Sequence, residues 1–201
     1  MKKIIFLISL IFILAGMSFA TERTEGATFY IVIDKSISME ESGAFEQVKS
    51  WLTTDFIPKK IIAGDRLVLY TFYGRTEKVA DIILNTDSDK SKLYEILDIL
   101  KADGKFTDIG LAVETVRRVA AKESPGRLTS MIVITDLKQE ADFSSPFAGV
   151  YAFQNRYMKY DKITSHGRDW YEISVRIPPE ADAMAKQLYA IIANSPANRD
   201  L

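Results

Sequence analysis

Two short apolar runs, each followed closely by an aspartate, constrain the fold of this chain more than any other feature. Residues 29–33 read Phe-Tyr-Ile-Val-Ile and lead directly into Asp34, and residues 131–134 read Met-Ile-Val-Ile and precede Asp136 by one threonine. Apolar runs without polar alternation are typical of strands that are covered on both faces. We therefore expect both runs to be central strands of a sheet.

The segments between these runs alternate between helical and strand patterns. Apolar residues recur at helical spacing over residues 44–56, 93–100 and 109–120, and Pro58 is expected to end the first of these helices. Residues 67–72 form another apolar run, from which a Gly-Arg-Thr turn leads into residues 79–84, an expected antiparallel neighbour. This order predicts an α/β fold: a doubly wound, mostly parallel central sheet with one antiparallel edge strand and helices on both faces.

The pattern is weaker after Asp136. We predict strands at residues 150–153 and 172–177 and a terminal helix that carries Met184, Leu188, Ile191 and Ile192. No helix is evident over residues 138–168, which are instead rich in aromatic residues: Phe143, Phe147, Tyr151, Phe153, Tyr157 and Tyr160. We expect the aromatic residues from Phe143 to Tyr171 to serve core and edge packing, the alternative being an exposed contact surface.

The first 20 residues have the layout of a secretory signal peptide. Two lysines precede an apolar stretch from Ile4 to Ala15, and small residues stand at Ser18 and Ala20. We predict cleavage after Ala20 and export to the periplasm or the medium of a bacterium, the alternative being an uncleaved membrane anchor. The absence of cysteine excludes an anchor on a lipid-modified cysteine and a fold held by disulfides.

Composition and length then indicate one mildly acidic domain. Without the first 20 residues, which hold two lysines and no acid, the formal net charge changes from −1 to −3. Such a charge gives no basic footprint for nucleic acid. We expect a polar lead-in at residues 21–26, one domain over residues 27–195 and a polar tail at residues 196–201.

Five oxygen donors are predicted to meet at one edge of the sheet. Parallel strands end at a common rim, and open α/β sheets bind ligands there, where the strand order reverses. The donors expected at this rim are Asp34, Ser36, Ser38, Thr107 and Asp136. Hard oxygen ligands of this kind suit Mg²⁺. The alternative for each of these residues is a local role, either in a turn or as a helix cap.

The segments Asp34-Lys35-Ser36-Ile37-Ser38, Phe106-Thr107-Asp108 and Ile134-Thr135-Asp136 together resemble the von Willebrand factor type A domain family. The resemblance implies a metal-ion-dependent adhesion site for Mg²⁺, or for Mn²⁺ or Ca²⁺. It implies that Ser36 and Ser38 bind the metal directly, that Asp34 and Asp136 bind it directly or through water, and that Thr107 joins or leaves the metal with conformational state. It also implies one coordination position for a carboxylate of a protein partner. Leu137 departs from the family, which often has glycine there.

Three functions follow as expectations. The leading one is a non-enzymatic, exported protein that binds a divalent cation and through it an acidic residue of a protein partner. The first alternative is a Mg²⁺-dependent phosphoryl-transfer or hydrolytic enzyme, and the second is a structural subunit of an envelope complex with a vestigial metal site. We expect no nucleic acid or nucleotide partner, and membrane contact only if the N-terminal segment stays uncleaved.

Other motifs indicate ordinary structural roles. His166, the only histidine, is expected in an exposed loop, because no acid-histidine-serine order or nucleophile elbow accompanies it. Asp87 and Asp89 are expected to cap a helix rather than to form a calcium loop, since the sharp turn of that loop lacks its glycine. Arg117 and Arg118 are expected on a solvated face.

Overall fold

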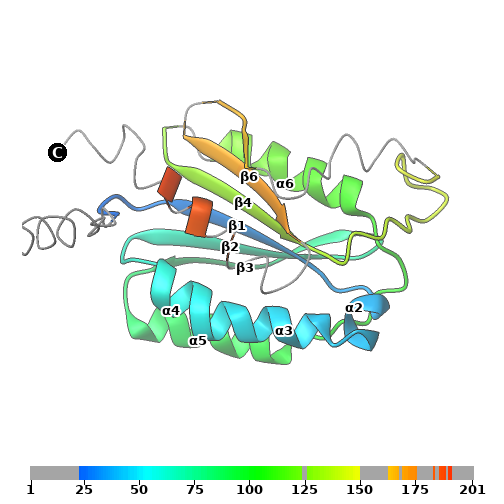
Figure 1. Cartoon of the computed structure of the whole chain (residues 1–201), viewed down its shortest axis with the longest axis horizontal. Helices are drawn as coiled ribbons and strands as arrows, with labels where there is room; N and C mark the ends of the chain where they lie inside the picture. Colours follow the sequence, from blue (N-terminus) through cyan, green and yellow to red (C-terminus); the bar gives the residue numbers. More distant parts are fainter. Residues whose placement is uncertain are drawn as a thin grey trace, which may run out of the picture.

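The structure is a computed structural model that describes residues 23–123, 126–149, 163–167 and 169–175, with six further positions between 183 and 191. One six-stranded sheet runs through it in the order β3-β2-β1-β4-β6-β5 (Figure 1). The strands are β1 (Thr28–Asp34), β2 (Asp65–Phe72), β3 (Thr76–Leu84), β4 (Thr129–Ile134), β5 (Thr164–Ser165) and β6 (Trp170–Val175). β1, β2, β4 and β6 are parallel, and β3 lies antiparallel to β2 at one edge. The predicted fold class is confirmed, and the short β5 adds an antiparallel pair at the other edge.

Helices cover both faces of the sheet. They are α2 (Ile37–Glu41), α3 (Ala44–Trp51), the π-helix η1 (Leu52–Phe56), α4 (Ile57–Lys60), α5 (Asp87–Ile99) and α6 (Ile109–Glu123). In Figure 1, α3, α4 and α5 lie against one face and α6 lies against the other.

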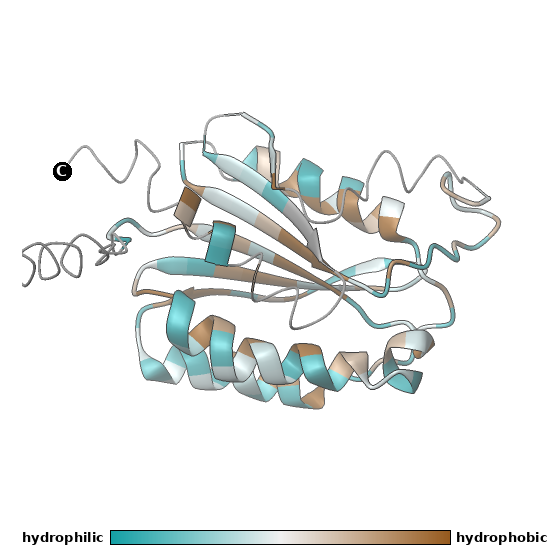
Figure 2. Ribbon diagram, in the orientation of Figure 1, coloured by the Kyte–Doolittle hydropathy of each residue, from teal (hydrophilic) through white to brown (hydrophobic). Residues whose placement is uncertain are grey.

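The residues of the central strand β1 point alternately to the two faces of the sheet. Because they are apolar on both faces, helices cover both. Phe29, Ile31 and Ile33 pack in the core beneath α3, η1 and α5, whereas Tyr30 and Val32 pack in the core beneath α6. All seven residues of β1 are buried. In Figure 2 the hydrophobic colour accordingly follows the central strands, and the hydrophilic colour gathers on helices and loops.

Pro58 does not end its helix, so that prediction is wrong. The chain stays helical to Lys60 because it widens into the π-helix η1 before the proline. In a regular α-helix the proline ring would clash with the carbonyl four residues earlier, and the widened turn relieves this clash. The hydroxyl of Thr54 donates to the Ser50 carbonyl at 2.8 Å and supports the widened segment.

The capping prediction at the start of α5 is confirmed. Thr86 is the N-cap residue and forms a capping box with Asp89, whose carboxylate accepts from the Thr86 backbone N–H at 3.0 Å. Asp87 itself lies in the first turn of the helix. No calcium loop is needed to explain these acids.

The C-terminal predictions are tested in part. Residues 138–149 form turns without a helix, as expected, and residues 170–175 form β6. The strand expected at 150–153 and most of the terminal helix lie outside the described residues, although Leu188 is described and is fully buried. Within the described part of the chain, no helix is long and apolar enough to span a bilayer; residues 1–22 lie outside it.

A buried ion pair closes the end of the sheet at which β1 begins. Arg23 and Asp65 form a hydrogen-bonded pair whose side chains are both fully buried. The Asp65 carboxylate also accepts from the backbone N–H groups of Ala27 at 2.8 Å and Ile62 at 2.9 Å. The guanidinium of Arg23 lies over the Phe29 ring, 5.3 Å from its centroid. The pair therefore joins the chain before β1 to the start of β2.

Replacing Arg23 by alanine is expected to lower the free energy of unfolding by about 3–5 kcal/mol, because Asp65 is left buried without its cation. Urea denaturation measures this change. Lys59→Ala, which removes an exposed pair with Asp55, is the control and is expected to change stability little. Equal effects of the two variants would show that burial of the Arg23 pair does not matter.

Candidate metal centre

Asp34 is a buried carboxylate at the carboxyl end of the central strand. β1 pairs with β2 on one side and β4 on the other, so the strand order reverses around it, as predicted. Asp34 is 0% exposed, and its two oxygens accept from the Ser36 N–H at 2.8 Å and the Thr135 hydroxyl at 2.6 Å. Among the described residues, no Lys, Arg or His forms an ion pair with it.

The hydroxyls of Ser36 and Ser38 are hydrogen-bonded to each other, and Ser36 also interacts with Asp34. Their oxygens lie 3.2 Å apart, and the Ser36 residue is buried. Two neighbouring ligands of an octahedral Mg²⁺ lie roughly 2.9 Å apart, since each Mg–O distance is about 2.0–2.1 Å. The spacing of the two hydroxyls is therefore close to what one Mg²⁺ requires.

Thr107 lies on a loop that is paired on both sides with the other donor loops. On one side the Ile37 N–H donates to the Gly104 carbonyl at 2.8 Å, and the Gly104 N–H donates to the Lys35 carbonyl at 3.0 Å. On the other side Thr107 and Glu140 exchange two backbone hydrogen bonds of 3.0 and 2.8 Å. This pairing brings the predicted Thr107 loop beside the Asp34 loop and beside the segment after Asp136.

Asp136 follows β4 and acts electrostatically on Asp34. Its side chain is 12% exposed, accepts from the Lys138 N–H at 3.2 Å and lies 3.4 Å from the Lys138 ammonium. Burial raises the pKa of Asp34 to about 6, hydrogen bonds from Thr135 and Ser36 oppose this rise, and the charge of Asp136 adds to it. The two carboxylates therefore share one rim, as predicted.

Two of the residues that shape the site were missed at the sequence level. Thr135 is fully buried and holds one oxygen of Asp34, and its hydroxyl also accepts from the Leu137 N–H at 3.1 Å. In the sequence, this role of Thr135 was indicated only by a hydroxyl residue directly after a buried strand. Gln139 accepts from the Ile109 N–H at 2.8 Å and donates to Asp108 at 3.1 Å. Nothing in the local pattern around Gln139 indicates this role.

Leu137 adopts the left-handed conformation that favours glycine, with φ of 70°. Its side chain is only 5% exposed and packs in the core beneath α6. Left-handed backbone costs a non-glycine residue roughly 1–2 kcal/mol, and burial of a leucine side chain contributes about 1.5–3 kcal/mol. Leu137 thus makes a left-handed turn and adds a contact to the core.

Asp108 caps α6 and also secures the segment after Asp136. Its carboxylate accepts from the Leu111 N–H at 3.0 Å, from Gln139 and from the hydroxyl of Ser145. These bonds are possible because residues 138–149 run beside the start of α6 without forming a helix. The segment that lacks a helix is therefore held against the rim of the candidate site.

Three sequence interpretations need correction. Arg117 is not simply solvated: its guanidinium donates twice, at 2.7 Å each, to the buried carboxylate of Glu172. His166 is exposed, as predicted, yet one of its ring nitrogens lies 2.8 Å from the same carboxylate. Among the aromatic residues, Phe147 is buried but Phe143 is 92% exposed, and Tyr151, Phe153, Tyr157 and Tyr160 lie outside the described residues.

The donor loops thus converge, although metal ligation by Asp34, Ser36, Ser38, Thr107 and Asp136 stays a prediction. In the described part of the chain, no three Asp, Glu, His or Cys side chains gather as a metal cluster, so hydroxyl oxygens must complete any site at this rim. The chemistry of the donors fits a hard cation: they are two carboxylates and three hydroxyls, and one carboxylate is buried without a cationic partner among the described residues.

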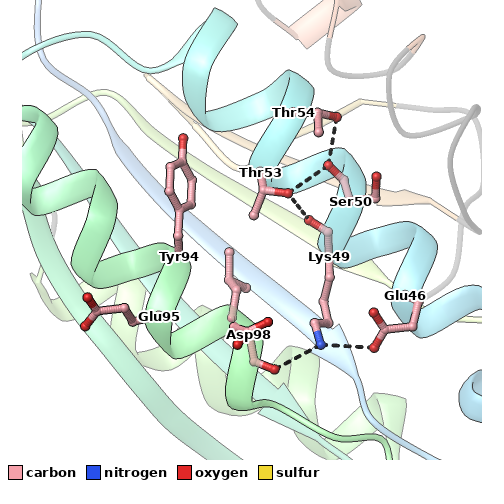
Figure 3. A pocket seen from close by; sticks show the side chains of 9 residues that line it. Glu46, Lys49, Ser50, Thr53, Thr54, Tyr94, Glu95 and Asp98 are labelled. Carbon is pink, nitrogen blue, oxygen red and sulfur yellow. Dashed lines mark hydrogen bonds and ion pairs between the residues drawn. The ribbon is translucent and has the colours of Figure 1, made fainter.

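A separate groove of about 680 Å³ lies between α3–η1 and α5 (Figure 3). Its polar groups largely contact one another: the Lys49 ammonium lies 3.0 Å from Glu46 and 3.2 Å from the Asp98 carbonyl. None of the predicted metal ligands lines it. The groove therefore adds nothing to the candidate metal centre.

Comparison with known proteins gives independent evidence of the family to which the chain is similar. A sequence profile of the von Willebrand factor type A domain matches residues 29–139, the segment from β1 to just past Asp136. An uncharacterized protein of Treponema pallidum (strain Nichols) is 30% identical over 184 residues, which are 90% of this chain and 82% of that protein.

Solved structures show the same fold at lower identity. A von Willebrand factor type A structure from Catenulispora acidiphila matches 85% of this chain and 42% of its own length, with 16% identity and a TM-score of 0.55. The conserved hypothetical protein BatB from Bacteroides thetaiotaomicron matches 85% of this chain and 100% of its own length, with 15% identity and a TM-score of 0.52. Three other matching structures are much longer, and this chain spans only 20%, 36% and 33% of them.

The raised pKa of Asp34 predicts that the metal-free protein loses stability as pH rises from about 4 to 6. In that range the unfolded state releases the Asp34 proton and the folded state retains it, so deprotonation favours unfolding. The expected loss is about 2–3 kcal/mol. Urea midpoints measured on chelator-treated protein test it. Asp34→Asn should remove this part of the pH dependence and should be more stable than the parent at pH 7.

Gly104→Ala is expected to destabilise the protein by about 1–3 kcal/mol, because a Cβ at this position would lie 2.3 Å from the Tyr73 Cβ. The substitution also displaces the loop that pairs with Lys35 and Ile37. Thermal unfolding measures the effect, with Lys105→Ala at the exposed neighbouring position as control. Stability equal to that of the control would contradict the close packing of this loop.

Proposed function

The chain belongs to the von Willebrand factor type A domain family, and on this premise we propose that it is an exported, non-enzymatic binding protein. Its rim at Asp34, Ser36, Ser38, Thr107 and Asp136 binds a divalent cation, Mg²⁺ in the first place. Through this cation the protein binds an acidic side chain of a protein partner.

One observation carries the proposal: Asp34 is a fully buried carboxylate that no described cationic side chain neutralises. Buried charges in proteins are normally paired with an opposite charge or coordinate a metal. A divalent cation at the rim supplies this charge and lowers the pKa of Asp34 from about 6 back toward its ordinary range. The two serine hydroxyls next to Asp34 supply neutral oxygen ligands.

The residues around the rim have separate roles that suit a binding site. Thr135 and the Ser36 N–H orient the Asp34 carboxylate, and the pairing through Gly104 and Glu140 positions Thr107. A bound Mg²⁺ supplies an electrophilic contact point for a carboxylate oxygen. The two acids of the rim balance the divalent charge, and a carboxylate oxygen of a partner replaces one of the waters that Mg²⁺ usually retains.

The proposal of a non-enzymatic role rests on what surrounds the rim. Among the described residues, the single histidine is engaged with Glu172 on β6, and no phosphate-cradling glycine loop is present in the sequence. The one histidine of the sequence is therefore engaged elsewhere and does not serve as a general base beside the predicted ligands. Export is proposed from the N-terminal segment alone, whose layout is that of a secretory signal.

Isothermal titration with Mg²⁺ and Mn²⁺ tests the metal site. The parent chain is expected to bind one ion, and Asp34→Asn, Asp136→Asn and Ser36→Ala/Ser38→Ala are each expected to weaken binding by at least about tenfold, because each removes a ligand. Affinity should also fall below about pH 6, where protons compete for Asp34.

Asp87→Ala is the matched control, since it removes an exposed acid from α5 away from the rim. Its metal affinity should equal that of the parent. Thermal unfolding of each variant shows whether it is folded. A parent chain that binds neither ion, or variants that bind as tightly as the parent, would disprove the proposed site.

A further inference from the structure

Tyr73 follows β2 directly and contacts both loops that carry predicted metal ligands. The carbonyl of the preceding residue, Phe72, accepts from the Lys35 N–H at 2.8 Å, and the carbonyl of Tyr73 itself accepts from the Asp108 N–H at 2.7 Å. Lys35 directly follows the first predicted ligand, and Asp108 directly follows Thr107. The end of β2 is therefore bonded to a neighbour of the ligands on each of the two loops.

The side chain of Tyr73 lies against the backbone of Gly104. A Cβ built on Gly104 would lie 2.3 Å from the Tyr73 Cβ and 2.6 Å from its Cγ, so no other residue fits at this position without a shift. Gly104 also pairs the two ligand loops, since its N–H donates to the Lys35 carbonyl at 3.0 Å and its carbonyl accepts from the Ile37 N–H at 2.8 Å. The Tyr73 side chain thus packs on the residue at which the loops are joined.

Two cationic side chains lie over the Tyr73 ring. The Lys35 ammonium is 4.8 Å from the ring centroid, and the central guanidinium carbon of Arg75 is 5.3 Å from it. Both distances are within the roughly 6 Å at which cations and aromatic rings attract each other. Lys35 is further paired with Asp103 at 3.2 Å, and Arg75 with Glu77 at 2.6 Å. The ring therefore has a defined position, and a side chain of the first ligand loop is bound to it.

The spacing between the two loops decides which cation the predicted ligands suit. Ser36 and Ser38 lie on one loop and Thr107 lies on the other, so the arrangement of the three hydroxyls depends on how the loops pair. Mg²⁺ requires near-octahedral ligands at about 2.0–2.1 Å, whereas Ca²⁺ accepts roughly six to eight oxygens at about 2.3–2.6 Å in a flexible geometry. A small shift between the loops therefore weakens Mg²⁺ binding more than Ca²⁺ binding.

We propose that Tyr73 is a positioning residue that fixes the spacing between the Ser36–Ser38 loop and the Thr107 loop and thereby favours Mg²⁺ over Ca²⁺. This inference rests on the proposed function. Tyr73 does not bind the metal, and it acts through its packing on Gly104 and its contact with Lys35. Because the ring fills the space beside Gly104, its removal allows the paired backbone of the two loops to shift.

Isothermal titration of the full chain with Mg²⁺ and with Ca²⁺ tests this inference. Tyr73→Ala is expected to lower the Mg²⁺ affinity by about tenfold, as for other groups that orient metal ligands, and the Ca²⁺ affinity by less than about threefold. Tyr73→Phe keeps the ring and its contacts and should equal the parent with both ions. Tyr94→Ala, which removes a tyrosine of α5 that lines the separate groove, is the control for lost packing and should leave the ratio of the two affinities unchanged.

Hydrogen exchange of the metal-free protein gives a readout that does not depend on the ion. The amides of Gly104 and Ile37 form the bonds that pair the two loops. They should exchange about tenfold faster in Tyr73→Ala and at the parent rate in Tyr73→Phe, because the alanine variant loosens the pairing locally. Equal acceleration of the amides of β4 would show a general loss of stability and would overturn the positioning role.

Gly104→Ala changes the same contact from the other side and decides the question if Tyr73→Ala does not fold. Its added Cβ displaces the paired loops from Tyr73, so the ratio of Mg²⁺ affinity to Ca²⁺ affinity should fall in this variant as well. Thermal unfolding of each variant shows whether it is folded.

The outcomes separate the two proposals. If the parent binds Mg²⁺ and the affinity ratio is unchanged in folded Tyr73→Ala or Gly104→Ala, the role of Tyr73 is overturned and the metal-dependent function stands. Equal losses in Tyr73→Phe and Tyr73→Ala would also overturn that role, because the hydroxyl and not the packing of the ring would then be responsible. A parent chain that binds neither ion overturns the proposed function and this inference with it.

Discussion

The candidate site depends on one constraint: the carboxylate of Asp34 is buried at the end of the central strand, and none of the described residues supplies a cation to it. Hydrogen bonds from Thr135 and Ser36 satisfy its oxygens but do not neutralise its charge. The consequence is a pKa raised to about 6 by burial, with Asp136 adding to the rise. The neighbouring loops are arranged around this charge, and they place the hydroxyls of Ser36 and Ser38 close to it.

At the opposite end of the sheet, a second buried aspartate has its charge compensated by a cationic side chain. Asp65 is as deeply buried as Asp34, but Arg23 and two backbone N–H groups compensate its charge. The pair joins the segment before β1 to β2 and contributes to the fold alone. Asp34 therefore differs from Asp65 in its hydrogen-bond partners and in having no cationic partner among the described residues.

The segment after Asp136 combines a left-handed turn with an irregular path beside α6. The left-handed turn that often takes glycine is made by Leu137, whose side chain packs into the core. Residues 138–149 then run along the start of α6, bound through Glu140, Gln139 and Ser145, and hold Phe143 in solvent. A helix at this place would bury one side of the segment against the sheet. The irregular path instead places Gln139 and Ser145 against Asp108 and pairs the Glu140 backbone with Thr107.

The sequence by itself determined the fold class, the antiparallel edge and the order of the donor loops. Continuous apolar runs and helical periodicity are local patterns, and strands and helices of this kind pack favourably as a sheet with helices on both faces. It also indicated Asp34, Ser36, Ser38, Thr107 and Asp136, since a strand end followed by oxygen donors is visible in a few residues. Only the tertiary structure decided which charges are compensated, as with Arg23 and Asp65 or Arg117 and Glu172, and which aromatic residue is exposed. These properties arise from contacts between residues distant in sequence, and no local pattern records them.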